Sequence, residues 1–172
     1  MNLRLQPPRL DDEEEFVAAH RAMTADGFTF GLGYAPGMPW ADYLDRLAAW
    51  RVGVDLPGDN VPSTLLVAEV NSVIVGRASI RYEISNPFLE REGGHIGYCV
   101  LPVHRRRGYA TEILRQSLVV VRSVGVDRVL VTCDDDNVGS ATVIERGGGV
   151  FESLTENTEN PNGARKRRYW ID

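Results

Sequence analysis

The chain has 172 residues, of which 43% are hydrophobic and 25% charged, and its formal net charge is −5. These proportions are typical of a soluble globular protein, and the length predicts one domain over 1–172 with a core of its own. The acidic balance argues against a general nucleic-acid-binding protein, so no nucleic-acid partner is expected.

The sequence also gives no reason to expect a membrane or a metal as partner. No apolar stretch approaches the roughly 20 residues that a membrane-spanning helix needs, and the acidic N-terminal segment does not resemble a signal peptide. Cys99 and Cys133 both fall in predicted strands. This favours two reduced core thiols over a disulfide or a metal pair, and we expect a cytoplasmic protein.

The first part of the chain predicts one short strand and two helices. Leu3–Leu5 alternates apolar and polar residues, as a half-buried strand does. Asp11 or Asp12 is suited to cap a first helix with an acidic first turn. After a loop rich in glycine and aromatic residues at Gly27–Pro39, apolar residues near helical spacing predict a second helix over Trp40–Val52.

The middle of the chain predicts a hairpin, a strand and a helix. Thr64–Val70 and Val73–Ile84 are two apolar runs separated by the tight turn Asn71-Ser72. A third strand is expected over His95–Leu101. Apolar residues on one helical face then predict a helix over Tyr109–Arg122.

The last part of the chain completes a mixed pattern. It predicts a buried strand over Arg128–Cys133, a helix over Asn137–Arg146 that ends at three glycines, and strands over Val150–Leu154 and Lys166–Ile171. A polar turn containing Asn160-Pro161-Asn162-Gly163 separates the last two strands. The order β-α-α-β-β-β-α-β-α-β-β predicts a mixed α/β (α+β) domain.

The strongest functional signal is the transition from the third strand of the middle region to the following helix. The strand ends at Pro102, the basic turn Arg105–Arg107 follows, and Gly108 precedes the helix. A helix N-terminus offers unpaired N–H groups and a positive dipole end, and glycine lets an anion approach the backbone closely. The pattern predicts a pyrophosphate site for a nucleotide-bearing cofactor, with a solvated basic turn as the alternative.

Two motifs resemble the GNAT superfamily of acyl-CoA-dependent N-acetyltransferases. The first is Val100-Leu101-Pro102 followed by Arg105-Arg106-Arg107-Gly108-Tyr109-Ala110, and the second is Asn137, Ser140, Glu145 and Gly147-Gly148. Three further stretches look like a functionally unassigned subgroup of predicted acetyltransferases: Gly93–Tyr98, Thr132–Asn137 and Arg168–Ile171. The resemblance covers most of the chain from Thr64 onward.

The resemblance implies a fold and a set of acetyl-CoA contacts. A V-shaped splay is expected between the strands His95–Leu101 and Arg128–Cys133, with acetyl-CoA as cosubstrate in the V and no metal. Backbone groups of Cys99, Val100 and Leu101 would bind the pantetheine arm. Amides of the turn and of the helix start would hold the pyrophosphate: Arg105, Arg106, Arg107, Gly108, Tyr109, Ala110 and Thr111. Asn137 and Ser140 would contact the cofactor from the other side, although Asn137 also suits a helix N-cap.

The resemblance leaves the general acid open. Many members of the family carry a tyrosine one residue before the helix glutamate, and that position is Ile144 here. Tyr98 and Ser140 are therefore candidates for protonating the departing thiolate, with Tyr109, Tyr169 or water as alternatives.

The general base is open as well. His95 begins the central strand, and its ordinary pKa near 6.5 suits an amine base, although a structural role in the core or a turn remains an alternative. Glu69 and Glu83 on neighbouring strands compete with it.

The function implied is transfer of an acetyl group from acetyl-CoA to the primary amine of a small molecule by direct attack. The alternatives are a protein or peptide N-acetyltransferase and a non-catalytic acyl-CoA-binding module. The acceptor pocket is expected along Gly27–Trp40 and Arg81–Arg91, and the net charge slightly favours a cationic amine. Since many relatives are dimers, a homodimer is left open.

Overall fold

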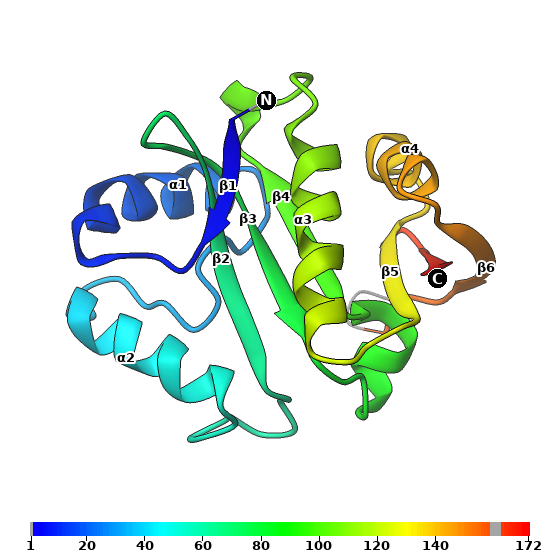
Figure 1. The fold of residues 1–172 in the computed structure, drawn as a ribbon, viewed down its shortest axis with the longest axis horizontal. Helices are drawn as coiled ribbons and strands as arrows, with labels where there is room; N and C mark the ends of the chain where they lie inside the picture. The colour runs from blue at the N-terminus through cyan, green and yellow to red at the C-terminus, as the bar shows by residue number, and fades with distance from the viewer. Residues whose placement is uncertain (1, 159–162) are drawn as a thin grey trace.

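The computed structural model describes residues 2–158 and 163–172, in which seven strands form one sheet flanked by helices (Figure 1). The strand order is β1-β2-β3-β4-β5-β7-β6. The elements are β1 (Leu3–Gln6), α1 (Glu13–Ala25), α2 (Trp40–Arg51), β2 (Ser63–Val70), β3 (Val73–Arg81), β4 (Ile96–Val100), α3 (Tyr109–Ser123), β5 (Val129–Asp134), α4 (Val138–Arg146), β6 (Val150–Thr155) and β7 (Lys166–Ile171).

The predicted order of strands and helices is confirmed, and the differences are local. Both Asn71 and Ser72 have positive φ, 51° and 63°, as a two-residue hairpin turn requires. β3 ends at Arg81 rather than Ile84, because its partner β2 begins at Ser63, opposite Arg81. A π-helical turn at Leu89–Gly93 replaces the expected loop. The predicted polar turn at 160–162 lies outside the described residues.

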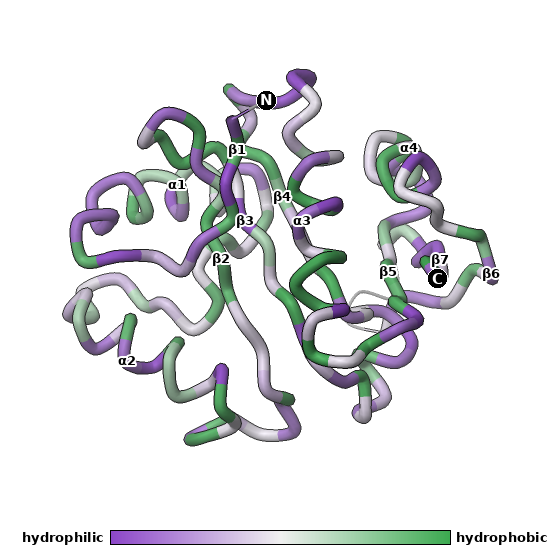
Figure 2. The backbone as a smooth tube through the Cα atoms, in the orientation of Figure 1, coloured by the Kyte–Doolittle hydropathy of each residue, from purple (hydrophilic) through white to green (hydrophobic). Residues whose placement is uncertain are grey.

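Each face of the sheet carries its own hydrophobic core. On one face, α3 packs against β3 and β4 with Ile113 and Leu114 fully buried. Figure 2 shows the alternation of hydrophilic and hydrophobic residues along α3 that makes this packing favourable. On the other face, α1 and α2 surround Phe16, which contacts Phe30, Trp40 and Tyr43 at ring-centroid distances of 5.0 to 5.5 Å. Phe30 of the glycine-rich loop and Trp40 and Tyr43 of α2 thus belong to the hydrophobic core on this face.

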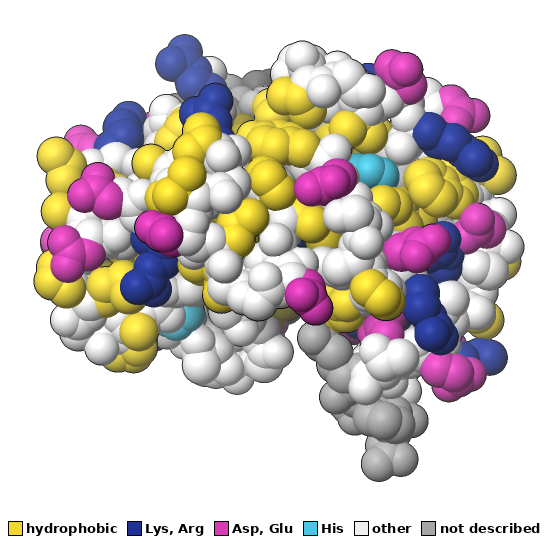
Figure 3. Space-filling view, turned by 90° about the horizontal axis from the view of Figure 1, so that it is seen from below, with side chains coloured by type: hydrophobic (Ala, Val, Ile, Leu, Met, Phe, Trp, Pro, Cys, Tyr) yellow, Lys and Arg dark blue, Asp and Glu magenta, His cyan; other side chains and the backbone are white. Residues whose placement is uncertain are grey.

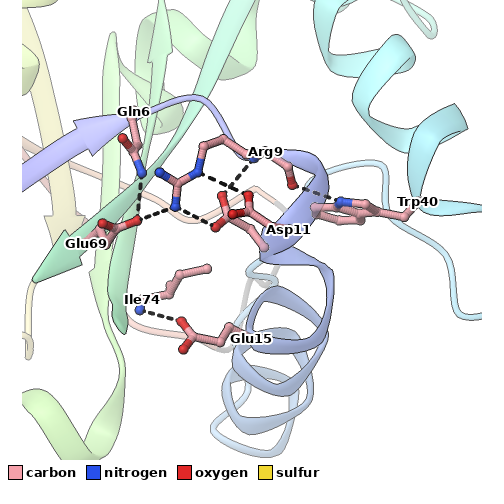
Figure 4. A network of polar contacts seen from close by, with 8 residues as sticks. Gln6, Arg9, Asp11, Glu15, Trp40, Glu69 and Ile74 are labelled. Atoms are coloured by element: carbon pink, nitrogen blue, oxygen red, sulfur yellow. Dashed lines mark hydrogen bonds and ion pairs between the residues drawn. The ribbon is translucent and has the colours of Figure 1, made fainter. Parts of the chain in front are cut away.

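Polar contacts fasten α1 and α2 to β2 and β3 (Figure 4). The Arg9 guanidinium contacts Glu69 of β2 at 2.8 Å, and the Trp40 indole N–H donates to the Arg9 carbonyl at 3.0 Å. Glu15 of α1 accepts a hydrogen bond from the backbone N–H of Ile74 at 2.9 Å. Glu69 therefore serves a structural ion pair, which weakens the case for it as a base.

The sheet opens between β4 and β5. These two strands run parallel and pair at Ile96↔Val131 alone, whereas β3 and β4 pair antiparallel from Gly76↔Val100 to Ile80↔Ile96. All other neighbouring strands are antiparallel. Beyond Ile96, one edge of β4 consequently has no strand beside it, and the predicted V-shaped splay is confirmed.

Both cysteines are buried free thiols, as predicted. Cys99 lies in the core beside α1 and α2, and Cys133 lies in the core beside α3. In the described parts of the chain no helix is both long and apolar enough to cross a bilayer.

Candidate functional site

The turn between β4 and α3 is exposed and has an unusual backbone. At the top of Figure 1 the chain leaves β4, makes a short 3-10 turn at Pro102–His104 and enters α3 at Tyr109. Arg106 and Gly108 have φ of 65° and 80°, in the left-handed region that glycine tolerates best. The side chains of residues 105–107 are exposed. The turn is therefore open to a ligand from solvent.

The amides of this turn are unpaired. Within the described chain, the N–H groups of residues 106–111 have no hydrogen-bond partner, and the first bonded amide of the helix is that of Glu112, which donates to the Gly108 carbonyl at 3.3 Å. Six consecutive free amides at the positive end of a 15-residue helix form a favourable anion site. They are six of the seven predicted pyrophosphate contacts; the seventh, the Arg105 amide, donates to the Pro102 carbonyl at 3.3 Å.

The three arginines of the turn have different partners. The Arg105 guanidinium pairs with Asp26 at the end of α1 and donates through Nε to the Val100 carbonyl at 3.2 Å. Arg106 and Arg107 have no carboxylate partner among the described residues. Arg105 thus fastens the turn to the fold, and Arg106 and Arg107 supply free positive charge.

The open edge of β4 presents specific backbone groups. The Leu101 N–H donates to the Val75 carbonyl at 2.9 Å, toward β3. Because successive residues of a strand direct their amides to opposite sides, the N–H groups of Tyr98 and Val100 point toward the splay. Of the three positions predicted to bind the pantetheine arm, Val100 presents its N–H to the open side, whereas Cys99 and Leu101 present theirs to β3.

A hydrogen bond connects the two arms of the V. The Tyr98 hydroxyl of β4 lies 2.8 Å from the Ser140 hydroxyl of α4, and Asn137 caps α4 by accepting from the Ser140 N–H at 3.0 Å. Burial raises the pKa of Tyr98 to about 12, so this phenol keeps its proton at neutral pH. Two of the predicted catalytic side chains therefore meet where β4 and β5 diverge.

The remaining tyrosine alternatives are less suited to this position. Ile144, at the place where the family usually carries tyrosine, is fully buried in the core. The buried Tyr169 donates its hydroxyl hydrogen to Glu145 at 3.1 Å. Tyr109 packs at the margin of the same core.

His95 is buried at the base of the V. It is 6% exposed, and its Nδ1 accepts a hydrogen bond from the Leu130 N–H at 2.9 Å. Burial, reinforced by the positive charge of Arg81, lowers the pKa of His95, so the ring is neutral with its proton on Nε2. A ring whose one lone pair is already engaged fits the structural alternative better than the role of base. Glu83 lies exposed in the loop after β3.

Charged groups elsewhere pair with one another. Asp134 and Asp135 contact Lys166 and Arg165, and Arg168 contacts Glu152. In residues 2–158 and 163–172 no group of three or more His, Cys, Asp or Glu side chains is arranged to hold a metal ion.

The sequence reasoning missed two buried charged residues near the V, Arg77 and Glu92, and it included the half-buried Arg81 only as the start of the expected acceptor range Arg81–Arg91. Arg77 and Arg81 stand four residues apart in β3, which puts both on one face of the sheet. Glu92 of the π-helical turn accepts from Thr158, and its second oxygen has no partner in the described chain. The signal that could have revealed Arg77 and Arg81 is their even spacing within a predicted strand that is otherwise mostly apolar, because it places both on one face of the sheet.

Solved structures similar to this chain include several acetyltransferases. The structure of Mycobacterium smegmatis RimJ in complex with CoA-disulfide aligns with a TM-score of 0.70 at 21% identity, over 98% of this chain and 81% of that one. The microcin C7 self-immunity acetyltransferase MccE, in complex with acetyl-CoA and AMP, aligns with a TM-score of 0.70 at 16% identity, over 98% and 91%. An N-acetyltransferase from Staphylococcus aureus aligns with a TM-score of 0.67 at 16% identity, over 100% and 99%.

At these identities the structural likeness establishes the fold alone. No curated protein matches the sequence significantly. The model of the acetyltransferase (GNAT) domain family, however, matches residues 2–150. With the splayed sheet and the free amides of the β4–α3 turn, this match assigns the chain to the GNAT family, and the protein is an acyltransferase of that family.

Proposed function

We propose that the protein transfers an acetyl group from acetyl-CoA to the primary amine of a small molecule by direct attack, without a covalent enzyme intermediate. The observation that carries this proposal is the continuity of two features. The unpaired edge of β4 leads directly into the turn whose amides, at 106–111, are free. An extended chain ending in a diphosphate fits such a path, because it can add to the strand edge and end on the helix N-terminus.

The residues of the turn would hold the phosphates. The amides of 106–111 donate hydrogen bonds to phosphate oxygens, and Arg106 and Arg107 add positive charge. Charge-assisted hydrogen bonds of this kind are each worth about 1.5–3 kcal/mol. Arg105 acts indirectly, since its pairing with Asp26 fixes the turn against α1.

The open amide of Val100 would polarise the reacting carbonyl. A donor aimed at the oxygen on which negative charge develops is worth about 10²–10³ in rate. When bound, acetyl-CoA supplies an acyl carbon activated as a thioester. The amine nitrogen bonds to that carbon, the carbon–sulfur bond breaks, and the amine loses a proton to solvent.

Tyr98 and Ser140 would serve the departing sulfur. Because the phenol of Tyr98 stays protonated and is 2.8 Å from the Ser140 hydroxyl, the pair can donate a hydrogen bond to the thiolate and pass it a proton. His95 would be a positioning residue, because its hydrogen bond to the Leu130 N–H fixes β5 at the base of the V.

Acetyl-CoA binding and turnover test this proposal separately. Calorimetry is expected to detect saturable acetyl-CoA binding, and thiol release should depend on an added amine. Tyr98→Phe should lower kcat by about 10²-fold or more while the Kd of acetyl-CoA stays within twofold. Ser123→Ala, which removes an exposed hydroxyl that donates to the Val120 carbonyl at the end of α3, is the control and should leave kcat unchanged. Absence of saturable acetyl-CoA binding would overturn the proposal.

A further inference from the structure

The face of β3 opposite α3 carries two arginines in a largely apolar environment. Ala78 and Ile80 belong to the core beside α3, so the alternating Arg77 and Arg81 point to the opposite face. There Arg77 lies 5.0 Å from the ring centroid of Phe28 and is 4% exposed. A buried guanidinium in such a place is costly unless an anion compensates its charge.

No anion of the described chain compensates either charge. Arg77 Nη2 donates to the Thr29 carbonyl at 2.9 Å, and Arg77 Nε is buried with no hydrogen-bond partner among residues 2–158 and 163–172. Arg81 Nη1 has two long contacts, 3.3 and 3.4 Å, to the carbonyls of Gly93 and Gly94. All of these partners are neutral, so two cations share this face without a carboxylate.

The remaining titratable neighbours do not supply negative charge. Cys99 and Tyr43 are the groups that favour the charged form of Arg77, but burial raises the pKa of both, and both are neutral at pH 7. Burial and the nearby Arg77 lower the pKa of Arg81 to about 10, which leaves it cationic. Glu92 contacts Thr158 and forms no ion pair with either arginine.

The two guanidiniums converge above Gly97. A Cβ built on Gly97 would lie 3.5 Å from Arg81 Nη1 and 4.0 Å from Arg77 Nη1. Gly97 is half-buried, and it is the first residue of β4 beyond the single β4–β5 pair at Ile96↔Val131. Because these distances are ordinary van der Waals contacts, the missing side chain of Gly97 leaves room for about a methyl group beside both arginines, at the start of the open edge.

We infer that Arg77 and Arg81 bind an oxyanion of the acceptor, so that the substrate is a small amine carrying a carboxylate or phosphoryl group. This inference rests on the proposed function and specifies its acceptor. Planar guanidiniums match the geometry of carboxylate and phosphoryl oxygens, and a ligand anion would supply the charge that the chain lacks there. Figure 3 shows one face of the molecule, on which acidic and basic side chains are interspersed.

Matched acceptors test the inference. The probes are the standard amino acids, the α-carboxamide of each, and aminomethylphosphonate beside glycine, assayed by amine-dependent thiol release. The wild-type protein should prefer the best amino acid over its carboxamide by about 10- to 100-fold in kcat/KM. The phosphonate arm distinguishes a phosphoryl from a carboxylate ligand. Equal rates for acid and carboxamide together with no preference for aminomethylphosphonate over glycine, or a peptide amide as the best acceptor, would overturn the inference.

Variants connect the preference to the arginines. Arg81→Gln should reduce the preference for the acid to within about threefold, and Arg81→Lys should retain part of it. Arg128→Gln, at an exposed arginine that contacts Asp172, is the control and should retain all of it. A preference unchanged in Arg81→Gln and in Arg77→Gln would contradict the assignment.

Equilibrium binding separates this inference from the proposed function. Calorimetry with the same amino acids and carboxamides in the presence of CoA measures their Kd values, and therefore the preference for the carboxylate, without turnover. Denaturation curves verify that each variant is folded. If acetyl-CoA does not bind, the proposed function fails. If acetyl-CoA binds and amines are acetylated, but binding ignores the carboxylate, only the inference about Arg77 and Arg81 fails.

Discussion

Two glycines at opposite ends of α3 allow a matched test of the phosphate-binding turn. Gly108 precedes the helix with φ 80°, and Gly125 follows it with φ 92°. An alanine at either position adopts the left-handed region at a cost of about 1–2 kcal/mol. A Cβ on Gly125 would meet no atom within 4 Å, so the backbone strain is the main effect there. Both variants should therefore lose stability by similar amounts.

Only the variant at Gly108 should lose affinity for acetyl-CoA. Relief of the strain at Gly108 rotates the neighbouring amides, which are the free donors of 106–111. Loss of one hydrogen bond to a charged phosphate is worth about 1.5–3 kcal/mol, which corresponds to roughly 10- to 150-fold in Kd. Gly108→Ala is thus expected to weaken binding at least about tenfold, and Gly125→Ala less than about twofold.

The assay is calorimetry with acetyl-CoA on both variants, with unfolding in urea measured in parallel. If both variants lose stability equally and bind acetyl-CoA with the same Kd, the amides of the turn do not hold the phosphates. The reasoning from free amides to cofactor binding would then be refuted.

Three further predictions concern the fold around the site. Ile144→Tyr should not raise kcat and should destabilise the protein by about 1–3 kcal/mol, because Ile144 is fully buried against Gly149; a stable variant with higher kcat would contradict this. Asn137→Ala should cost about 1 kcal/mol in urea unfolding through loss of the α4 cap, and Asn137→Ser should recover most of it; equal losses would argue against capping. The pKa of His95 is lower in the folded than in the unfolded protein, so below about pH 6.5 the unfolded chain binds more protons. The free energy of unfolding therefore falls as the pH decreases from there, by up to about 1.4 kcal/mol for each unit by which folding lowers this pKa. His95→Asn keeps an acceptor for the Leu130 N–H and should weaken this pH dependence of stability between about pH 6.5 and 5. Part of the dependence should remain, because burial also lowers the pKa of His20. An unchanged stability curve would show that the pKa of His95 does not change on folding.

Local patterns were sufficient to predict the elements of this fold. Hydrophobic periodicity and glycine or proline at the boundaries gave the order of strands and helices, because those signals act over a few residues. The turn at Asn71-Ser72 and the cap at Asn137 followed from the conformational preferences of single residues. The π-helical turn at Leu89–Gly93 has no such simple signal and was expected as a loop.

Features of the site that depend on register or long-range packing were not predictable in this way. Whether the N–H of Val100 or of Leu101 faces the splay depends on the alignment of β4 with β3. The contact of Tyr98 with Ser140 joins residues 42 positions apart. Glu69 was a candidate base until its partner Arg9, 60 residues away, was known. In each case the role depends on a neighbour that the local sequence does not specify.

The placement of Arg77 and Arg81 is the most consequential of these features. An arginine in a predicted strand is ordinarily expected at an exposed position, because burying its charge is unfavourable. Only the packing of Phe28 and the position of Gly97 reveal that Arg77 is buried, that Arg81 is half-buried, and that the two guanidiniums converge. The overall charge of −5 pointed toward a cationic acceptor, whereas the local charge at the site points to an acceptor with an anionic group.

Hydrogen exchange of individual backbone amides, measured by NMR with and without saturating acetyl-CoA, tests the central claim most directly. The amides of 107–111 and of Val100, which lack partners in the described chain, should exchange at least about tenfold more slowly when acetyl-CoA is bound. The amide of Leu101, already bonded to Val75, should change little. Saturable binding that protects other amides and leaves 107–111 and Val100 unchanged would contradict the assignment of the β4 edge and its turn as the acetyl-CoA site.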